Sequence, residues 1–533
     1  MTANSLASAL PPSGEAGDDL AVVHAYHQRT KHHLDRYAAG PGSLDWDAQP
    51  DPFRHWQGTR RYELPRAQPG LDIPWAALDA ERAPAPFNLD SLGQLLRLTS
   101  AITAWKQYGP SRWALRAHPS SGNLHPTETW VIAYWADGLA DGLYHYQSRD
   151  HALEWRASTL AASDTPGLWL GFSSIAWREA WKYGERAFRY CQLDMGHVLA
   201  AAAYAAAMHG WQPRLVRLPH DAAAHCLGLD RKEDFIGVEA EEAEVLVAIH
   251  APGPDTAPLP PQNWDEWSGV PSLLDPRPMY QWPLIDEVAQ ATRGRLPALP
   301  AVQKPASILP AASQQSGTQA VEVILNRRSA QAFDGQSVMP PEIFRSILTS
   351  LLPGGSPVWR MWTATPRVHP VLLVHRVEGV APGLYILPRA DSARDELKAA
   401  LHKEFEWSSA DDHLPLYRLI AAKAERTART ISCHQDIASM SAFTLMFVAE
   451  FDAPLTENPA AWRHLHWEAG MLGHCATLEA EAAGWRGTGI GCFFDDADHE
   501  ILDITDTRYQ VIYHYAIGMA VDDARLTTLP AYE

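Results

Sequence analysis

The sequence has little that would tie it to a disulfide framework or to a membrane. Five cysteines stand far apart in 533 residues, with an odd count and no CxxC pair: Cys191, Cys226, Cys433, Cys475 and Cys492. This usage is typical of buried free thiols in a reducing compartment. No run approaches the roughly 18 apolar residues of a membrane span. The chain also lacks a basic start followed by an apolar run, so we expect no signal peptide and a cytoplasmic location.

Positive charge is scarce as well. The formal net charge is −19, which argues against nucleic acid or an anionic membrane as a partner. None of the 24 histidines belongs to an H-E-x-x-H or Cys/His ligand set, so we expect no metal site. A Rossmann GxGxxG, a GxSxG nucleophile motif and a phosphate-binding GKS/T loop are missing too.

What the chain does contain is an internal repeat. Residues 194–211 and 468–485 align without a gap, 274 positions apart, so that Gly196 falls on Gly470 and Trp211 on Trp485. Gly142-Leu143-Tyr144 likewise recurs as Gly383-Leu384-Tyr385. With 46% hydrophobic residues the chain can bury large cores, and its length predicts more than one domain.

The repeat divides the chain into two similar halves. We expect a flexible tail over residues 1–18, a first domain over 19–250, a proline-rich extended connector over 251–318 and a second domain over 319–533. Apolar runs predict strands at 129–135, 244–250, 369–376, 442–450 and 510–517 and helices at 91–105 and 339–351, besides the repeat helices. The fold class is therefore α+β, with a mixed or antiparallel sheet flanked by helices in each domain. Duplicated halves of this size usually pair about a pseudo-twofold axis.

Three short segments carry candidate chemistry. Arg327-Arg328-Ser329 opens the second half and suits a phosphate, although a solvated basic patch is the simpler interpretation. Ser120-Ser121-Gly122-Asn123 is a polar turn that suits a heterocycle edge or a ribityl chain, or has only a structural role. Gly487, Gly489 and Gly491 would let the backbone approach a planar ligand closely.

Together these segments resemble the FMN-dependent nitroreductase superfamily. The resemblance rests on Arg-Arg-Ser at 327–329, on Pro-Ser-Ser-Gly-Asn-Leu-His-Pro at 119–126 and on Gly-Ile-Gly-x-Phe-x-Asp-Asp at 489–496. The segments 26–32, 181–190 and 194–197 are similar to the SagB-type branch, whose members oxidise azolines to azoles in peptide natural-product biosynthesis. The resemblance implies two tandem nitroreductase-like domains that form an intramolecular pseudo-dimer.

The resemblance also implies one FMN per chain, bound between the halves. The second half would supply Arg327, Arg328 and Ser329 to the phosphate and ribityl chain, and Gly489, Ile490 and Gly491 to the isoalloxazine. The first half would supply Ser120, Ser121 and Asn123, and Arg525 would be a further phosphate ligand. The opposite site has decayed in sequence. It reads Trp362 to Pro370 in place of the polar turn and Arg29-Thr30-Lys31 in place of Arg-Arg-Ser.

Lys182 and Tyr183 are the catalytic candidates. In the azoline dehydrogenase branch this adjacent pair is thought to take part in proton removal beside the flavin. A lysine acts as a base only if its pKa is lowered, and Arg186 and Arg189 are candidates to lower it, with Glu185 opposing them. A surface lysine beside an interface tyrosine is the alternative, and the sequence leaves open which site the pair faces.

The sequence thus favours an FMN-dependent dehydrogenase or oxidase that acts on a peptide-derived or small heterocyclic substrate such as an azoline, with other biosynthetic enzymes as candidate partners. Further oligomerisation beyond the pseudo-dimer stays open. Two alternatives remain. One is an NAD(P)H-dependent nitro or quinone reductase, and the other is a degenerate flavin-binding scaffold in a biosynthetic complex.

Overall fold

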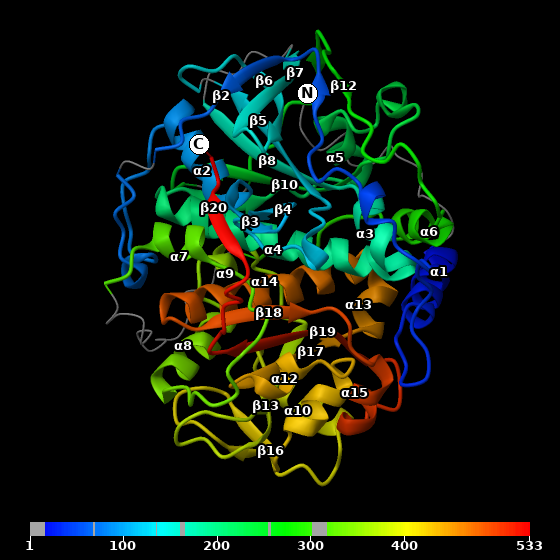
Figure 1. Ribbon diagram of the computed structural model, residues 1–533, viewed down its shortest axis with the longest axis vertical. Helices are drawn as coiled ribbons and strands as arrows, with labels where there is room; N and C mark the ends of the chain where they lie inside the picture. The colour runs from blue at the N-terminus through cyan, green and yellow to red at the C-terminus, as the bar shows by residue number, and fades with distance from the viewer. Residues whose placement is uncertain are drawn as a thin grey trace.

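The computed structural model describes residues 16–67, 70–134, 136–159, 166–253, 257–300 and 317–532. Two β-sheets lie toward opposite ends of the long axis, and two long helices cross the molecule between them (Figure 1). Residues 1–15 of the expected flexible tail lie outside the described residues, and helix α1 (Ala16–Arg29) begins directly after them.

The sheet of the first half is antiparallel and has the order β11-β7-β6-β5-β8-β10-β9, with β2 also paired to β7. Its central strand β5 is buried along its whole length, as the apolar run at 129–134 predicts; residue 135 lies outside the described residues. The strands are β2 (Arg60–Glu63), β5 (Thr127–Tyr134), β6 (Gly142–Gln147), β7 (Ala152–Thr159), β8 (Gly167–Ser174), β9 (Gln212–Leu215), β10 (Glu242–His250) and β11 (Trp264–Asp265).

The sheet of the second half is also antiparallel, with the order β15-β16-β14-β13-β17-β19-β18. Six of its strands follow one another along the chain and across the sheet as β5 to β10 do in the first half. The strands are β13 (Val368–Val374), β14 (Gly383–Ile386), β15 (Ser408–Ser409), β16 (Tyr417–Ala421), β17 (Phe443–Glu450), β18 (Arg486–Ile490) and β19 (Tyr509–Gly518). The two halves therefore share one topology.

The Gly-Leu-Tyr repeat has the same structural role in both halves. It begins β6 in the first half and β14 in the second. The Tyr144 hydroxyl donates to the Ala140 carbonyl, and the Tyr385 hydroxyl donates to the Ala381 carbonyl at 2.7 Å. Each tyrosine thus ties its strand to the turn that precedes it.

The repeat segments form the two long central helices, α4 (Ala187–Met208) and α14 (Ala461–Ala482), which pack against each other. A Cβ atom on Gly196 would lie 2.2 Å from the carbonyl oxygen of Trp467, and one on Gly470 would lie 2.2 Å from that of Leu193. Because these pairs are related by the same 274-residue offset, the crossing is symmetric and needs glycine on both sides. The halves pack as an intramolecular pair.

One cluster of buried apolar side chains continues through this crossing. It joins Val131 of β5 and Leu199 of α4 to Leu472 of α14 and Phe447 of β17. Each half also has a smaller outer cluster, around Trp130 in the first and around Val371 in the second. The halves share a core, so neither sheet is buried on both faces without the other half.

The helix expected over residues 91–105 is shorter than predicted. Helix α2 (Leu89–Thr99) begins at a capping box made by Asn88 and Ser91, and the chain then enters strand β3 (Ile102–Tyr108). Strand β3 pairs with β4 (Ser111–Arg116) and with β20 (Thr527–Pro530) at the end of the chain. The C-terminal segment of the second half therefore crosses onto the first half, as Figure 1 shows.

The connector expected to be extended contains regular structure where it is described. Strand β11 adds to β7 of the first sheet, and β12 (Val270–Pro271) pairs with β1 (Trp56–Gln57). Helix α6 (Pro283–Ala291) packs against α1. Residues 257–300 thus lie mainly on the first half, but the Thr292 hydroxyl accepts from Arg463 and the Arg295 carbonyl accepts from Asn458 of the second half. Residues 254–256 and 301–316 lie outside the described residues.

Shorter helices surround the two sheets. They are α3 (Ala176–Tyr183), α5 (His220–Leu227), α7 (Ala320–Asn326), α8 (Pro341–Leu351), α9 (Val358–Met361), α10 (Ala393–Ala400), α11 (Glu425–Ile431), α12 (Asp436–Met440), α13 (Asp452–Glu457) and α15 (Asp495–Leu502). Among the described residues, we find no helix with the length and apolar character needed to cross a membrane.

Candidate functional site

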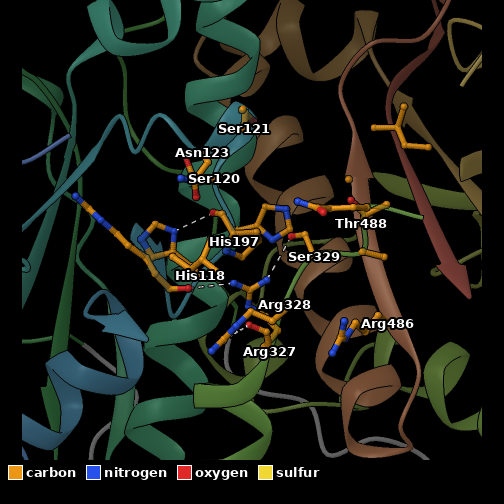
Figure 2. A pocket seen from close by; sticks show the side chains of 18 of the residues that line it. His118, Ser120, Ser121, Asn123, His197, Arg327, Arg328, Ser329, Arg486 and Thr488 are labelled. Atoms are coloured by element: carbon orange, nitrogen blue, oxygen red, sulfur yellow. Dashed lines mark hydrogen bonds between the residues drawn. The ribbon is translucent and has the colours of Figure 1, made fainter. Parts of the chain in front are cut away.

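A cavity of about 560 Å³ opens between the two halves. Its walls come from the polar turn before β5, from α4, from the segment after α7, from β18 and from the crossing C-terminal segment. Figure 2 shows the turn and His118 beside Arg327, Arg328 and Ser329, with Thr488 and Arg486 along β18. The cavity lining contains every proposed site residue except Lys182 and Arg525. We call it the first cavity.

The polar turn is held in place by α4. The Ser121 backbone N–H and hydroxyl donate to the Asp194 carboxylate at 3.0 and 2.8 Å. The Ser120 hydroxyl accepts from His125 N–H at 2.8 Å, and the Asn123 amide donates to the Ala114 carbonyl at 2.9 Å. Gly122 and Asn123 have φ values of 57° and 59°, in the left-handed region that suits these two residue types. The three side chains expected to bind a ligand therefore also fix the shape of the cavity wall.

Asp194 is a site residue to which the sequence analysis gave no role. Burial raises its pKa to about 7, and the hydrogen bonds from Ser121 oppose that rise. Its carboxyl lines the first cavity. A signal was present in the sequence, since Asp194 begins the repeat segment 194–211, which lies within α4.

Arg327 and Arg328 form the cationic wall of the first cavity. Buried Arg327 donates to the carbonyls of Arg116 and Ala117, both at 3.0 Å, and Arg328 donates to Leu325 and Arg327 carbonyls. Burial lowers the pKa of both guanidinium groups, that of Arg328 to about 10. Within the described chain, no carboxylate lies at ion-pair distance from either one. Glu481 attracts both guanidinium groups from beyond that distance, and Asp522 and Asp523 line the same cavity. Two adjacent cations without an ion-pair partner suit an anion.

Two buried histidines of the cavity lining each have one ring nitrogen without a hydrogen-bond partner in the described residues. His118 Nδ1 lies 3.0 Å from the Pro119 carbonyl, and His197 Nε2 lies 3.2 Å from the Tyr513 hydroxyl. His118 Nε2 and His197 Nδ1 have no hydrogen-bond partner among the described residues. Burial lowers the pKa of His118 to about 3 and that of His197 well below its usual value, so both rings are neutral. Such nitrogens suit the polar edge of a ligand.

The glycines expected in a loop lie on an edge strand and beyond it. Gly489 and Ile490 belong to β18, the last strand of its sheet, and Gly491 follows directly. A Cβ on Gly489 would lie 1.9 Å from the Tyr513 hydroxyl, and one on Gly491 would lie 2.4 Å from the Tyr190 ring. The absence of a side chain at Gly489 and at Gly491 thus leaves room for Tyr513 and Tyr190. The free edge of β18 presents backbone groups to the cavity.

Tyr183 faces the first cavity from α3. Its hydroxyl stands over Gly122, where a Cβ would come within 2.4 Å. Lys182 lies outside the lining, with its Nζ 5.2 Å from the centre of the Tyr183 ring and 5.6 Å from that of Trp46. The pair therefore reaches the cavity that contains Arg-Arg-Ser, through the tyrosine.

The charges around Lys182 differ from those expected. Arg186 and Arg189 both bind Asp495, at 3.0 and 2.9 Å, and Glu185 pairs with Arg29. Burial lowers the pKa of Lys182, and Glu179, one helical turn before it, opposes that effect. Glu179 is fully buried, and neither of its carboxyl oxygens has a hydrogen-bond partner in the described chain. Burial raises the pKa of Glu179 well above its usual value.

Arg525 lies on the surface, outside the cavity lining. Its guanidinium pairs with Asp523 at 2.7 Å, two residues earlier. The crossing segment instead contributes Asp522, Asp523 and Thr528 to the wall. Nothing in the described structure brings Arg525 to Arg327 and Arg328.

The chain was compared with known proteins. No family model and no curated protein matches it. A protein from Anabaena variabilis classed as a nitroreductase superposes with a TM-score of 0.66, over 94% of this chain and 99% of its own, at 20% identity. The chain has the nitroreductase fold. The match covers nearly all of both chains, and the two halves of this chain repeat one sheet topology.

Shorter solved chains match about half of the sequence. A protein classed as a nitroreductase from Ralstonia eutropha is 18% identical over 42% of this chain and 90% of its own, with a TM-score of 0.28. A chain of the E. coli microcin synthetase McbBCD complex with truncated pro-MccB17 bound is 16% identical over 45% of this chain and 94% of its own, with a TM-score of 0.26.

The paired nitroreductase folds also enclose a second cavity, of about 1,660 Å³. Residues 362–366 line it, at the place where the first half has its polar turn. The Arg29-Thr30-Lys31 segment does not, because Arg29 pairs with Glu185, Thr30 accepts from Arg189 and Lys31 pairs with Asp496. Two of the arginines that line the second cavity have carboxylate partners, since Arg360 binds Asp79 and Arg389 binds Glu468. No group of three or more metal-ligating side chains occurs anywhere in the described residues.

Proposed function

We propose that the chain is an FMN-dependent oxidoreductase with one flavin, bound in the first cavity. The observation that carries the proposal is the unpaired Arg327–Arg328 wall in a cavity between two nitroreductase-fold halves. A phosphate would supply the missing counter-charge through charge-assisted hydrogen bonds. The resemblance of the three sequence motifs to the FMN-dependent superfamily supports the same cofactor.

The residues present fit such a group. Arg328 and the exposed Ser329 would bind the phosphate, while Arg327 also fixes the strand before the polar turn. His118 Nε2, His197 Nδ1 and the free edge of β18 would bind the polar edge of the isoalloxazine. Asp194 would keep the polar turn against that ring system. Residues of both halves line the first cavity and would contact the flavin, so a single chain would form one complete site.

Bound flavin supplies the acceptor for the hydride in a dehydrogenation. The chain must then remove the proton, and Lys182 is the base because burial lowers its pKa. Burial also raises the pKa of Glu179, which weakens the negative charge that would otherwise stabilise the ammonium of Lys182. Burial raises the pKa of Tyr183 well above its usual value, so its hydroxyl stays protonated and orients the substrate as a donor.

The family resemblance suggests the substrate class, and the approach to Lys182 is compatible with it. Trp46 is 60% exposed and lies edge-on to Trp181, with 5.3 Å between ring centres. This aromatic rim suits a heterocycle carried on a peptide. We therefore assign an azoline or a related heterocycle as substrate, with dioxygen as the final electron acceptor and other biosynthetic enzymes as candidate partners.

The test is reconstitution followed by two reduction experiments. The purified chain is incubated with FMN, desalted, and its released flavin is quantified per chain; we expect one. Under anaerobic conditions an azoline peptide should then bleach the flavin, and NAD(P)H should not. Rapid bleaching by NAD(P)H alone would favour the nitro or quinone reductase. Protein that stays colourless would refute the flavin site and favour a scaffold.

A further inference from the structure

Two of the five cysteines meet beside the first cavity, although they are separated by 58 residues in the sequence. Cys492 follows Gly491 and lines the cavity, whereas Cys433 follows helix α11. The Cys433 and Cys492 thiols interact directly, which raises the pKa of Cys433 and lowers that of Cys492. Both are only half-buried, whereas Cys191, Cys226 and Cys475 are buried elsewhere in the fold. The prediction of five buried thiols is therefore wrong for this pair.

The backbone holds the two cysteines together. Phe494 N–H donates to the Ile431 carbonyl at 2.8 Å, and the Gln435 amide donates to the Cys492 carbonyl at 3.1 Å. Cys433 and His434 have φ values of 52° and 58°. Two successive left-handed residues other than glycine are uncommon and tend to occur at functional sites. This turn directs Cys433 back toward Cys492.

The surroundings of Cys492 favour its thiolate. The hydrogen bond from Cys433 lowers the pKa of Cys492 against the effect of burial, and His32 and Arg186 lower it further. His32 Nδ1 accepts from Ala38 N–H at 2.9 Å, which leaves Nε2 to carry the ring proton and donate to the sulfur. Arg186 is fixed nearby by its hydrogen bond to the Gly491 carbonyl at 3.1 Å. A partly exposed thiol among such groups is reactive.

We propose that Cys433 and Cys492 form a dithiol–disulfide couple that exchanges two electrons with the flavin site and with an external dithiol. The link to the flavin rests on the proposed function; the couple itself does not. When the couple is reduced, an external dithiol becomes a disulfide, the Cys433–Cys492 bond breaks and each sulfur gains a proton. When the couple is oxidised, the Cys433–Cys492 bond forms, both S–H bonds break, and two electrons and two protons pass to oxidised flavin.

A thiol titration tests the couple. The full chain, incubated with FMN, is equilibrated anaerobically in glutathione buffers of increasing oxidised fraction, quenched with acid, denatured and alkylated with N-ethylmaleimide. We expect Cys433 and Cys492 to lose alkylation together and to appear in one cross-linked peptide. Cys191, Cys226 and Cys475 should stay alkylated, and Cys226→Ser should leave the titration unchanged. Separate alkylation, or a separate glutathione adduct on each cysteine at the oxidising end, would overturn the couple.

Two variants show whether the pair acts as a unit. Cys433→Ser should leave Cys492 as a glutathione mixed disulfide without a cross-link. His32→Gln should slow iodoacetamide alkylation of Cys492 in the native reduced chain by about tenfold, because the thiolate loses a hydrogen-bond donor. An unchanged rate in His32→Gln would contradict the assignment of Cys492 as the reactive thiol.

The link to the flavin has its own readout. Anaerobic dithiothreitol should bleach bound flavin in the unaltered chain, and Cys433→Ser and Cys492→Ser should slow that bleaching on the order of tenfold or more. Equal rates would refute electron exchange with the flavin. Failure to retain FMN would refute the proposed function and this link, while the thiol titration would still decide on the couple. Retention of FMN without a cross-link would refute the couple alone.

Discussion

The two cavities between the halves differ in how their charged side chains are paired. Asp194 and Glu468 occupy equivalent positions on α4 and α14. Asp194 receives the backbone N–H and hydroxyl of Ser121 and has no cationic partner in the described chain. Glu468 receives the backbone N–H groups of Arg367 and Val368 and also binds Arg389. The second carboxylate is neutralised from within the protein.

The arginines of the two cavities also differ in their partners. In the first cavity Arg327 and Arg328 bind only neutral oxygens, so their charges remain available to a ligand. In the second cavity, Arg360 and Arg389 are paired with Asp79 and Glu468. Arg82, Arg214 and Arg394 also line the second cavity, so the two cavities differ in how individual arginines are paired and not in whether cations are present.

The largest expected effect is on turnover at the first cavity. Lys182→Ala should lower kcat with an azoline substrate by about 10²–10⁴-fold, the usual contribution of a general base. FMN content and the visible spectrum should stay unchanged, because Lys182 lies outside the cavity lining. Lys423→Ala, at an exposed position of the second half, serves as the matched control. Full activity in Lys182→Ala would remove the lysine from the mechanism.

The next largest effect is on stability as a function of pH. Burial raises the pKa of Asp194 from 3.8 to about 7, so the folded apoprotein retains a proton that the unfolded chain releases. The free energy of unfolding should therefore fall as the pH rises through that range, by up to about 4 kcal/mol. Denaturant titrations of the apoprotein at several pH values would measure it. Asp194→Asn should flatten the profile, whereas Glu468→Gln should lower stability without flattening it. A slope that survives in Asp194→Asn would contradict the assignment.

Several features of this comparison could be predicted from the sequence. The repeat helices and the strand of each half at the centre of its sheet follow from local patterns, whereas the meeting of Arg-Arg-Ser with the polar turn follows from the family resemblance. An apolar run buried on both faces is recognisable wherever it occurs. The Gly196–Gly470 crossing follows from the repeat itself, because equivalent helices in paired halves must meet at equivalent residues.

Other features depend on contacts between distant residues. The helix expected over 91–105 stops at Thr99 because β3 pairs with β20, more than 400 residues later. The contact between Cys433 and Cys492 depends on how α11 meets the segment after β18. Arg525 and Glu179 are different cases, since both had local signals. Asp523 stands two residues before Arg525, and Glu179 one helical turn before Lys182, a spacing at which side chains interact.

A smaller effect separates the two cavities directly. Arg328→Gln should weaken FMN binding by about one to two orders of magnitude, the cost of losing a charge-assisted hydrogen bond. Arg360→Gln removes a similarly placed, half-exposed arginine from the second cavity and should leave FMN affinity unchanged. Fluorescence titration of the apoproteins with FMN measures both. Equal weakening in the two variants would mean that the second cavity also binds the cofactor.

The smallest expected effect tests what the halves still share. Gly196→Ala and Gly470→Ala each place a methyl group 2.2 Å from a backbone carbonyl oxygen of the facing helix, where no side chain can move away. Each should lower the free energy of unfolding by about 1–3 kcal/mol, after the gain in helix propensity is included. Because the crossing is symmetric, denaturant midpoints should shift equally in both variants. Unequal shifts would show that the divergence of the cavities extends into the helix crossing, whereas equal shifts would confine it to the residues that line them.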